Sequence, residues 1–274
     1  MTSRDFFQRV ADRLSEQGGT AEMGDLASEF LRVPDGPLAR RTFGALLSAD
    51  PRFLLSSGQI HLQEWDHGLR GSRLEELTFA VLDFETNGFA PVDRAIEIGI
   101  SCWRSGREVA SFDSLLDPGT GVSRFVTRLT GIREEDLIGR PTFETILPEV
   151  APLLEGAVVV AHNLPFDRRI LLGEIGLAGG DRRLAEPGMC TLKLARRLLP
   201  KEEPKSLDAL AERFSLSFQA RHRALGDARV TGSLLKILLD LAGERTPLDT
   251  FGDLEAFLFA PVERSSPSLR SPQV

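Results

Sequence analysis

Three short stretches of the chain combine carboxylates with a histidine in patterns that could bind a cation. Asp83 and Glu85 end an apolar run in VLDFETNG, Asp167 follows in HNLPFD, and His222 and Asp227 share RHRALGD. Residues i and i+2 of a strand point to the same side, so Asp83 and Glu85 project together from its carboxyl end. Two bare carboxylates this close repel, so they must share a proton or bind a cation. Carboxylate oxygens are the ligands that Mg²⁺ and other hard cations prefer.

The second and third stretches also have ordinary structural explanations. Pro165 suits the start of a helix and places Asp167 in its first turn, where the helix dipole stabilises an acid. Five residues of regular helix turn through about 140° net, so His222 and Asp227 would face different ways. They converge only if His222 lies in the loop before the helix and Asp227 lies on the helix. A histidine in such a loop could reach a reacting water.

Residues 77–243 alternate strands and helices. Four apolar runs predict strands: LTFAVLDFE, AIEIGISCW, EVASFDSLL and AVVVAHN. Helices are expected at 165–174, 191–199, 206–214 and about 223–241. An early meander followed by strand–helix units predicts an α/β domain.

Residues 1–70 predict a smaller α+β domain. Apolar residues recur at helical spacing in two segments, and Pro37 suits the start of a third helix. FLLSSGQIHL then predicts two strands around a turn, so the domain resembles a winged helix. Arg40 and Arg41 on the third helix would serve nucleic-acid binding. Because positions 1 to 77 hold 9 basic and 12 acidic residues, docking to a protein or internal packing stays an open alternative.

A short linker and a C-terminal segment complete the chain. Residues 71–76 (GSRLEE) predict a short polar linker. Within residues 244–274, TFGDLEAFLF could form a helix whose apolar face docks a partner or packs on its own domain. The final stretch, PVERSSPSLRSPQV, is rich in Ser and Pro and is expected to be disordered.

Composition narrows the class of protein. With 42% hydrophobic and 27% charged residues among 274, the chain is an ordinary globular protein of one or two domains. No apolar run reaches the roughly 18 residues of a membrane span, and the N-terminus lacks a secretory signal, so no membrane partner is expected. Two cysteines without a CxxC pair argue against a disulfide scaffold or a cysteine zinc site and favour the cytoplasm.

The net charge of −7 by itself counts against nucleic acid as a ligand. Residues 78–241 carry 21 basic and 23 acidic residues, a balance of −2. If four of these carboxylates hold metal ions, the remainder of the segment is +2. A phosphate substrate would then meet neutralised acids and surplus arginine.

In this order, the three stretches resemble the DnaQ-like 3′→5′ exonucleases with an Asp-Glu-Asp-Asp-His site, and above all the proofreading epsilon subunits of bacterial DNA polymerase III. The resemblance spans residues 78–241 and implies a ribonuclease H-like fold, a mixed sheet flanked by helices. The matching stretches are VLDFETNG, RAIEIGI, FVTRLTGI, VVVAHNLPFD, TLKLARRLLP, SLDALAERF and RHRALGDARVTGSLL.

The resemblance implies that Asp83, Glu85, Asp167 and Asp227 hold two Mg²⁺ or Mn²⁺ ions and that His222 is the catalytic base. In two-metal sites one ion lies near the attacking oxygen and the other near the leaving oxygen. His222, with a reference pKa of about 6.5, suits removal of a proton from the attacking water. The product would be a 5′-mononucleotide.

The resemblance also implies contacts with the last nucleotide. The expected residues are Thr86 near the 3′-OH, Leu129 and Thr130 at the base, and Asn163 and Phe166 positioning the nucleotide. Ordinary core packing is the alternative for Leu129 and Phe166. Asn87 departs from the family pattern, since many relatives have Thr there, and could alter contacts near the 3′ terminus. His162 is expected to have a structural role.

The expected function is metal-dependent 3′→5′ hydrolysis of single-stranded or frayed DNA ends in replication proofreading or repair, with a DNA polymerase subunit as a candidate partner. An RNA-trimming exoribonuclease is the alternative within this enzyme class, because no residue determines the sugar. An inactive interaction module is the second alternative. Since all five catalytic positions are filled, we favour the enzyme.

Overall fold

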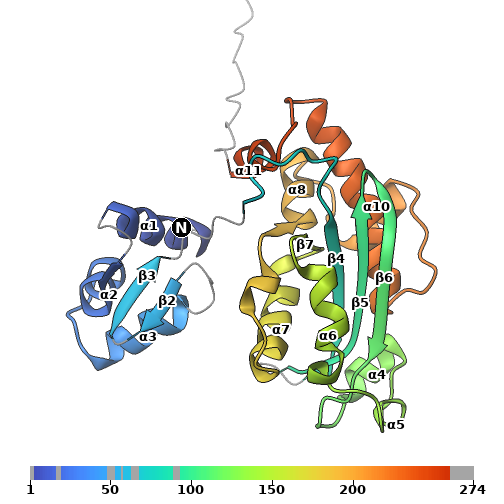
Figure 1. The fold of residues 1–274 in the computed structure, drawn as a ribbon, viewed down its shortest axis with the longest axis horizontal. Helices are drawn as coiled ribbons and strands as arrows, with labels where there is room; N and C mark the ends of the chain where they lie inside the picture. Colours follow the sequence, from blue (N-terminus) through green and yellow to red (C-terminus); the bar gives the residue numbers. More distant parts are fainter. Residues whose placement is uncertain are drawn as a thin grey trace, which may run out of the picture. The chain divides into compact units, whose positions relative to one another are not determined.

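The computed structural model describes residues 3–16, 20–47, 53–56, 58–62, 68–88 and 93–259. The chain divides into two compact units, Met1–Asp66 and His67–Val274 (Figure 1), and each is described by itself. The segment that we expected to be a linker belongs to the second unit. The backbone N–H of Leu74 donates to the carbonyl of Asp249 at 2.9 Å, and that of Phe251 donates to the carbonyl of Ser72 at 3.0 Å.

The first unit combines helices with a small antiparallel sheet, as expected. The helices are α1 (Ser3–Glu16), α2 (Met23–Leu31) and α3 (Pro37–Leu47). The strands are β1 (Thr20–Glu22), β2 (Phe53–Ser56) and β3 (Gln59–Leu62), in the order β1-β3-β2. Helix residues Leu14, Leu26 and Phe43 pack with Ile60 of the hairpin in one buried cluster. The winged-helix assignment of this unit stays a prediction.

Arg40, which we expected on a nucleic-acid-binding face, is paired within the first unit. Its Nε donates to Asp35 at 2.8 Å and its Nη2 donates to the second carboxylate oxygen at 2.5 Å. This two-point contact pairs the Arg40 charge with a carboxylate, although the side chains of both Arg40 and Arg41 are exposed.

The second unit is an α/β domain built on a five-stranded mixed sheet. The strands are β4 (Phe79–Thr86), β5 (Ala95–Arg104), β6 (Arg107–Leu115), β7 (Val158–Ala161) and β8 (Gly188–Cys190), in the order β6-β5-β4-β7-β8. The first three strands pair antiparallel, whereas β7 runs parallel to β4 and β8 runs parallel to β7. Four of these strands were predicted. The fifth, β8, has only three residues, too few for a periodic pattern.

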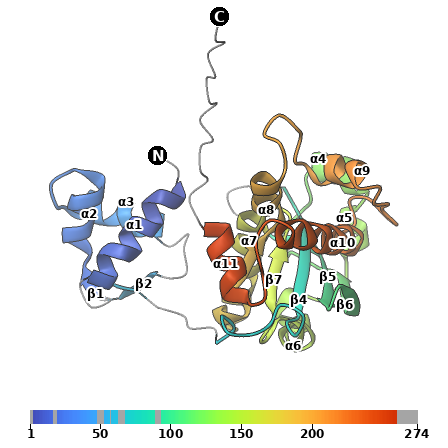
Figure 2. The ribbon, with the colours of Figure 1, turned by 90° about the horizontal axis from the view of Figure 1, so that it is seen from above.

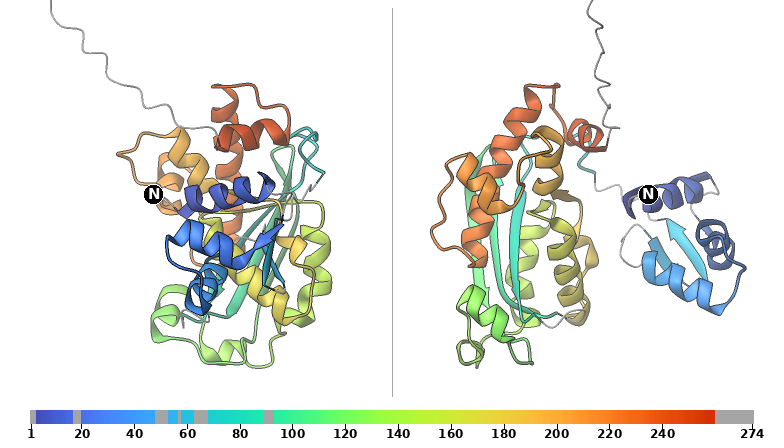
Figure 3. Two further views of the ribbon diagram at one scale, coloured as in Figure 1. Left: turned by 90° about the vertical axis from the view of Figure 1, so that its left-hand side faces the viewer. Right: turned by 180° about the vertical axis from the view of Figure 1, so that it is seen from behind.

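Helices cover both faces of this sheet (Figure 3). One side carries α6 (Phe143–Leu154) and α7 (Leu164–Leu177), and the other carries α8 (Thr191–Leu198), α9 (Leu207–Arg213) and α10 (Ala224–Gly243). The smaller elements are α4 (Arg124–Thr130), α5 (Glu134–Leu137) and the 3₁₀-helix η1 (Arg182–Ala185). The helices α7 to α10 lie where the sequence pattern predicted them.

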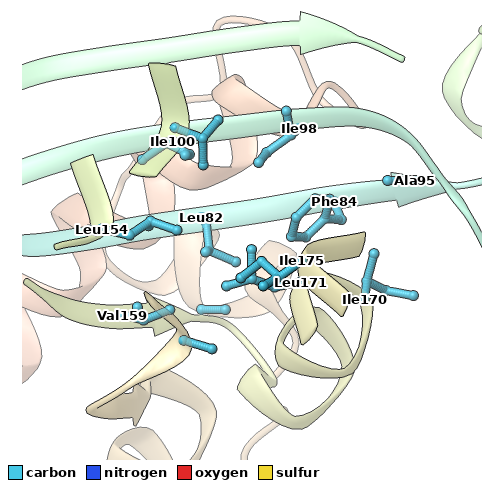
Figure 4. Packing of buried hydrophobic residues seen from close by; sticks show 14 of the residues in the cluster. Leu82, Phe84, Ala95, Ile98, Ile100, Leu154, Val159, Ile170, Leu171 and Ile175 are labelled. Atoms are coloured by element: carbon cyan, nitrogen blue, oxygen red, sulfur yellow. The ribbon is translucent and has the colours of Figure 1, made fainter. Parts of the chain in front are cut away.

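Alternate residues of β4 serve the two faces. Leu82 and Phe84 pack against α6 and α7 (Figure 4), whereas Phe79 and Val81 belong to the cluster on the α10 side. A strand has a period of two, so Asp83 continues the row of Phe79 and Val81. The apolar core therefore directs the acidic end of β4 toward the side that α10 occupies.

The helix α6 was not predicted, because its sequence contains Pro148 and Pro152. A proline inside a helix removes one backbone hydrogen bond and usually ends or kinks it. Both prolines are exposed and four residues apart, so they share one face. The carbonyls that lose a partner there can bind water, while Ile146 and Val150 on the opposite side are buried in the core.

The C-terminal helix α11 (Phe251–Phe259) packs on its own unit, beside α8 (Figure 2). Phe251 and Leu254 are buried in the cluster on the α10 face. Of the two roles considered for this segment, internal packing is the one observed. The Ser- and Pro-rich stretch expected to be disordered lies outside the described residues. Within the described part of the chain, no helix is both long and apolar enough to cross a lipid bilayer.

Gly99 of β5 allows α10 to approach the sheet closely. This glycine lies directly opposite Asp83 in the β4–β5 pair. A Cβ on Gly99 would lie 2.1 Å from the backbone nitrogen of Leu225. Such a contact with backbone cannot be relieved by rotation of a side chain. The missing side chain therefore fixes the position of the first turn of α10, which carries Asp227.

We expect Gly99→Ala to lower the free energy of unfolding by roughly 3 kcal/mol, because the added methyl group would push α10 away from β5. Gly173→Ala is the matched control, since a Cβ there meets nothing within 4 Å on the exposed side of α7. Alanine favours a helix interior over glycine by up to about 1 kcal/mol, so the control should be neutral or stabilised. Denaturant unfolding measures both. If Gly99→Ala and Gly173→Ala had equal free energies of unfolding, the role of Gly99 would be contradicted.

Candidate active site

The carboxyl end of β4 gathers the acidic residues that the sequence singled out. Asp83 and Glu85 lie on β4, and Asp167 lies in the first turn of α7. Asp227 lies in the first turn of α10, whereas His222 precedes that helix. Three atoms that could bind a metal, one each from Glu85, His222 and Asp227, all lie within 4.8 Å of one another. This is the loop-and-helix arrangement that lets His222 and Asp227 converge.

Two residues in left-handed conformations shape the loops at this end of the sheet. His222 has a φ of 58°, and Asn163, at the N-terminus of α7, has a φ of 80°. His and Asn adopt this region more readily than most residues. The turn at Asn163 brings the start of α7 to the end of β4. There the backbone N–H of Phe84 donates to Oδ1 of Asp167 at 3.3 Å.

Burial raises the pKa of all four carboxyl groups. Desolvation is the main cause and raises the pKa of Glu85 to about 8 and that of Asp227 to about 6. The pKa of Asp167 is also raised by burial. The pKa of Asp83 is raised well above its usual value by burial, and further by the charges of the other three. Four ionised carboxylates are therefore unfavourable here unless cations compensate them.

Arg221 supplies a positive charge beside the cluster. Its Nη1 donates to Oδ2 of Asp227, and its Nε and Nη2 donate to Asp208 at 2.5 and 2.9 Å. The guanidinium also lies 4.9 Å from the centre of the Phe218 ring. Arginine therefore neutralises only one side of the acidic cluster.

The second carboxylate oxygen of Asp227, Oδ1, indicates which kind of ligand the acidic cluster can bind. Oδ1 is buried and has no hydrogen-bond partner among the described residues. An unpaired buried carboxylate oxygen is unfavourable, and a cation can satisfy it. Carboxylate oxygens gathered in this way make a donor set that fits a hard divalent cation. The residues present therefore fit a divalent metal site.

Glu97 and Arg223 hold the loop that carries His222, and sequence reasoning did not single them out. Glu97 lies opposite Glu85 in the sheet and is buried. Its carboxylate accepts from Nη2 of Arg223 at 2.7 Å and from the backbone N–H of Ala224 at 3.1 Å. The available signal was a charged residue inside the otherwise apolar strand AIEIGI.

The residues expected to bind the last nucleotide differ in the exposure of their side chains and in whether their polar groups are already hydrogen-bonded. Leu129 is 44% exposed and Phe166 is 37% exposed, so neither is an ordinary core residue. Thr86 is half-buried at the end of β4, and Asn163 is exposed. The hydroxyl of Thr130 is already engaged at the end of α4. It donates to the carbonyl of Val126 at 3.0 Å and accepts from the N–H of Ile132 at 3.1 Å.

Asn87 and His162 have structural roles. Asn87 is buried, and its Nδ2 donates to Oγ1 of Thr120 at 2.9 Å in the segment before α4. His162 contacts Oγ1 of Thr191 at 3.0 Å and the carbonyl of Lys205 at 2.9 Å. Burial lowers the pKa of His162, so the neutral ring donates from Nε2 to the carbonyl. Asn87, where the sequence departs from the family pattern, therefore holds the segment before α4 in place. His162 connects Thr191 and Lys205, which is the structural role that we expected.

Residues 80–235 match the model of the exonuclease family RNase_T. Two relatives are named DNA polymerase III PolC-type. The one from Streptococcus suis is 36% identical over 188 residues, which cover 68% of this chain and 13% of that protein. The one from Thermotoga petrophila is 41% identical over 165 residues, which cover 60% of this chain and 12% of that protein. The chain thus spans about an eighth of the length of these curated relatives.

Solved structures share the fold of the second unit. Exonuclease X in complex with 5′ overhanging duplex DNA is 28% identical with a TM-score of 0.51, covering 60% of this chain and 93% of that one. The nuclease domain of 3′hExo, a DEDDh family member bound to rAMP, is 16% identical with a TM-score of 0.55, covering 66% and 97%. Exonucleases of this kind depend on divalent metal ions. With more than half of its residues matched by the family model, the chain belongs to the exonuclease family.

Proposed function

We propose that the second unit is a 3′→5′ exonuclease that releases 5′-mononucleotides from single-stranded or frayed DNA. The observation that carries this proposal is the convergence of Glu85, His222 and Asp227 beside Asp83 and Asp167. The identity of 36% and 41% to PolC-type DNA polymerases supports DNA as the substrate. It also supports a role in replication proofreading or repair, with a polymerase subunit as partner.

In this proposal Asp83, Glu85, Asp167 and Asp227 hold two Mg²⁺ or Mn²⁺ ions. Bound ions of this kind stabilise charge on the reacting phosphate and lower the pKa of the attacking water. The four carboxyls, whose pKa values burial raises, ionise when cations neutralise them. The unpaired Oδ1 of Asp227 supports this assignment.

His222 is the proposed general base. Burial and the charge of Arg221 lower the pKa of His222, so its ring is neutral near pH 7 and can accept the proton of the attacking water. The pair of Glu97 and Arg223 orients the loop by holding the backbone N–H of Ala224. A loop fixed in this way keeps the imidazole within reach of the water.

The proposed contacts with the last nucleotide are of two kinds, apolar contacts with the base and polar contacts with the sugar. Leu129 and Phe166 offer exposed apolar surface to the base. Thr86 and Asn163 offer polar groups to the sugar and its 3′-OH. Thr130 would contribute its methyl group, because its hydroxyl is engaged within α4.

Two further proposals concern the whole chain. The first unit would bind nucleic acid or a protein partner, as its helix–hairpin order suggests. Cys102 and Cys190 are free thiols, which fits a reducing cytoplasm as the location of the protein.

We expect His222→Ala to lower turnover on a 5′-labelled DNA oligonucleotide by about 10²- to 10⁴-fold, because proton transfer is lost. Mn²⁺ binding and thermal stability should be retained, since the four carboxylates stay in place. Asp83→Asn should abolish turnover. Lys201→Ala, an exposed change outside the acidic cluster, is the control. Near-normal turnover of His222→Ala would contradict its role as the base.

The raised carboxyl pKa values predict how stability depends on pH. Without divalent cations the folded protein keeps protons on Glu85 and Asp227 up to about pH 8 and pH 6. The unfolded chain releases them near pH 4, so stability falls as pH rises from about 4 to 8.

Excess Mg²⁺ should therefore raise the melting temperature by several degrees more at pH 8 than at pH 5, because protons compete with the cation at low pH. Thermal unfolding with Mg²⁺ or with a chelator measures this difference. Asp227→Asn should reduce it. An equal Mg²⁺ effect at the two pH values would argue against a metal site built from these carboxyls.

We expect digestion of labelled DNA to exceed that of RNA of the same sequence by about tenfold or more, which corresponds to roughly 1.4 kcal/mol in the barrier. Parallel digestion with Mg²⁺ measures the ratio. Faster digestion of RNA would make the exoribonuclease the correct function. No digestion of either strand, with intact metal binding, would favour the interaction module.

A further inference from the structure

A cavity of about 560 Å³ opens beside the carboxylate cluster. Asp83, Asn163 and Asp227 are among the residues that line it. Arg196 of α8 and Lys205 of the loop before α9 stand on its wall. The cavity therefore joins the proposed reaction centre to two side chains that can carry positive charge.

Most of the residues proposed to hold the last nucleotide lie outside the cavity. Asn163 lines it together with Asp83, whereas Thr86, Leu129, Thr130 and Phe166 are not part of its lining. Beyond the carboxyl end of β4 lies α4, which carries Leu129 (Figure 1). The two elements touch there, since a Cβ on Gly88 would lie 2.7 Å from Val126. A strand whose last nucleotide lies toward α4 would therefore pass over the carboxylates and continue into the cavity.

The charges on the cavity wall are available to an anion. Arg196 is exposed and has no carboxylate partner among the described residues. The Nζ of Lys205 donates to the backbone carbonyls of Pro200 at 2.6 Å and Glu203 at 2.5 Å, and the Glu203 carboxylate, on which the Lys205 charge acts, is already paired with Arg213. Arg221, also on the wall, is already shared between two carboxylates. Arg196 and Lys205 are thus the cations that a phosphate would meet.

The wall is held in place by contacts to the sheet. Nε2 of His162, directly after β7, donates to the carbonyl of Lys205 at 2.9 Å. Nδ1 of the same ring contacts Thr191 at the start of α8, the helix that carries Arg196. One half-buried histidine therefore ties both cationic elements to the strand end beside Asn163. A wall fixed in this way loses little conformational entropy when it binds a phosphate.

We propose that Arg196 and Lys205 bind backbone phosphate on the 5′ side of the scissile bond, so that the enzyme recognises at least one nucleotide upstream of the one it removes. This inference rests on the proposed exonuclease function. Phosphate contacts position a strand without reading its sequence, so the site suits an exonuclease that accepts any upstream base.

Two substrates separate this role from catalysis. The p-nitrophenyl ester of thymidine 5′-phosphate has a cleavable phosphodiester but no upstream phosphate, whereas an octamer of thymidylate has several. Arg196→Ala should lower kcat/KM on the octamer by about tenfold and leave that on the ester within about twofold. Lys201→Ala, which removes an exposed cation outside the cavity, should change neither. Equal losses on both substrates would overturn the proposal.

The salt dependence of binding gives a second readout that needs no turnover. With His222→Ala protein and Mg²⁺, log Kd for a labelled octamer should depend on log salt with a slope of about 0.7 per phosphate contact. Arg196→Ala should reduce that slope by about 0.7, whereas Arg196→Lys, which keeps the charge, should retain it. An unchanged slope in Arg196→Ala would overturn the proposal.

The two readouts also keep this inference apart from the proposed function. If the unaltered protein hydrolyses neither substrate, the exonuclease function is wrong, and the salt slope alone decides whether the wall binds phosphate. If the unaltered protein hydrolyses both substrates and Arg196→Ala affects them equally, the function stands and the upstream site is wrong. Thermal unfolding of each variant checks that it folds, which we expect because Arg196 is exposed.

Discussion

Four carboxylates at the carboxyl end of β4 repel one another and lose hydration together, and the second unit is arranged around that constraint. Burial raises the pKa of all four carboxyl groups, and the charges of the neighbouring acids raise the pKa values of Asp83 and Glu85 further. Arginine alone does not compensate these charges, because Arg221 contacts Oδ2 of Asp227, whereas Oδ1 has no hydrogen-bond partner among the residues that the structure describes. A cluster of this kind is stable only with protons or with divalent cations. In the proposed function, divalent cations compensate the four charges.

The apolar core is what forces these acids together. Asp167 and Asp227 begin helices on opposite faces of one sheet, and each helix is fixed by its own buried cluster. Gly99 then lets α10 approach β5, and Glu97 binds Arg223 and the N-terminus of α10. Rigid elements of this kind hold ligands more reproducibly than loops do. The repulsion among the carboxylates is thus opposed by packing that lies mostly outside the site.

The surroundings of the cluster differ in chemistry from one side to the other. Toward α4, Leu129 presents exposed apolar surface, with Phe166 exposed at the start of α7. On the other side the cavity presents Arg196 and Lys205. This asymmetry suits a strand that offers a base at one end and phosphates along its length. The first unit has a buried core of its own.

The sequence by itself determined the strands β4 to β7 and the helices α7 to α10, and placed Asp83 and Glu85 on one side of a strand, because strand and helix periods depend on neighbouring residues. Asp83, Glu85, Asp167 and Asp227 were predicted as metal ligands from their motifs and from the family that these motifs resemble. Only the tertiary structure decided that α6 survives two prolines and that Glu97 anchors the loop of His222. These outcomes depend on solvent exposure and on contacts between distant segments. Local spacing carries no information about either, so packing alone settles them.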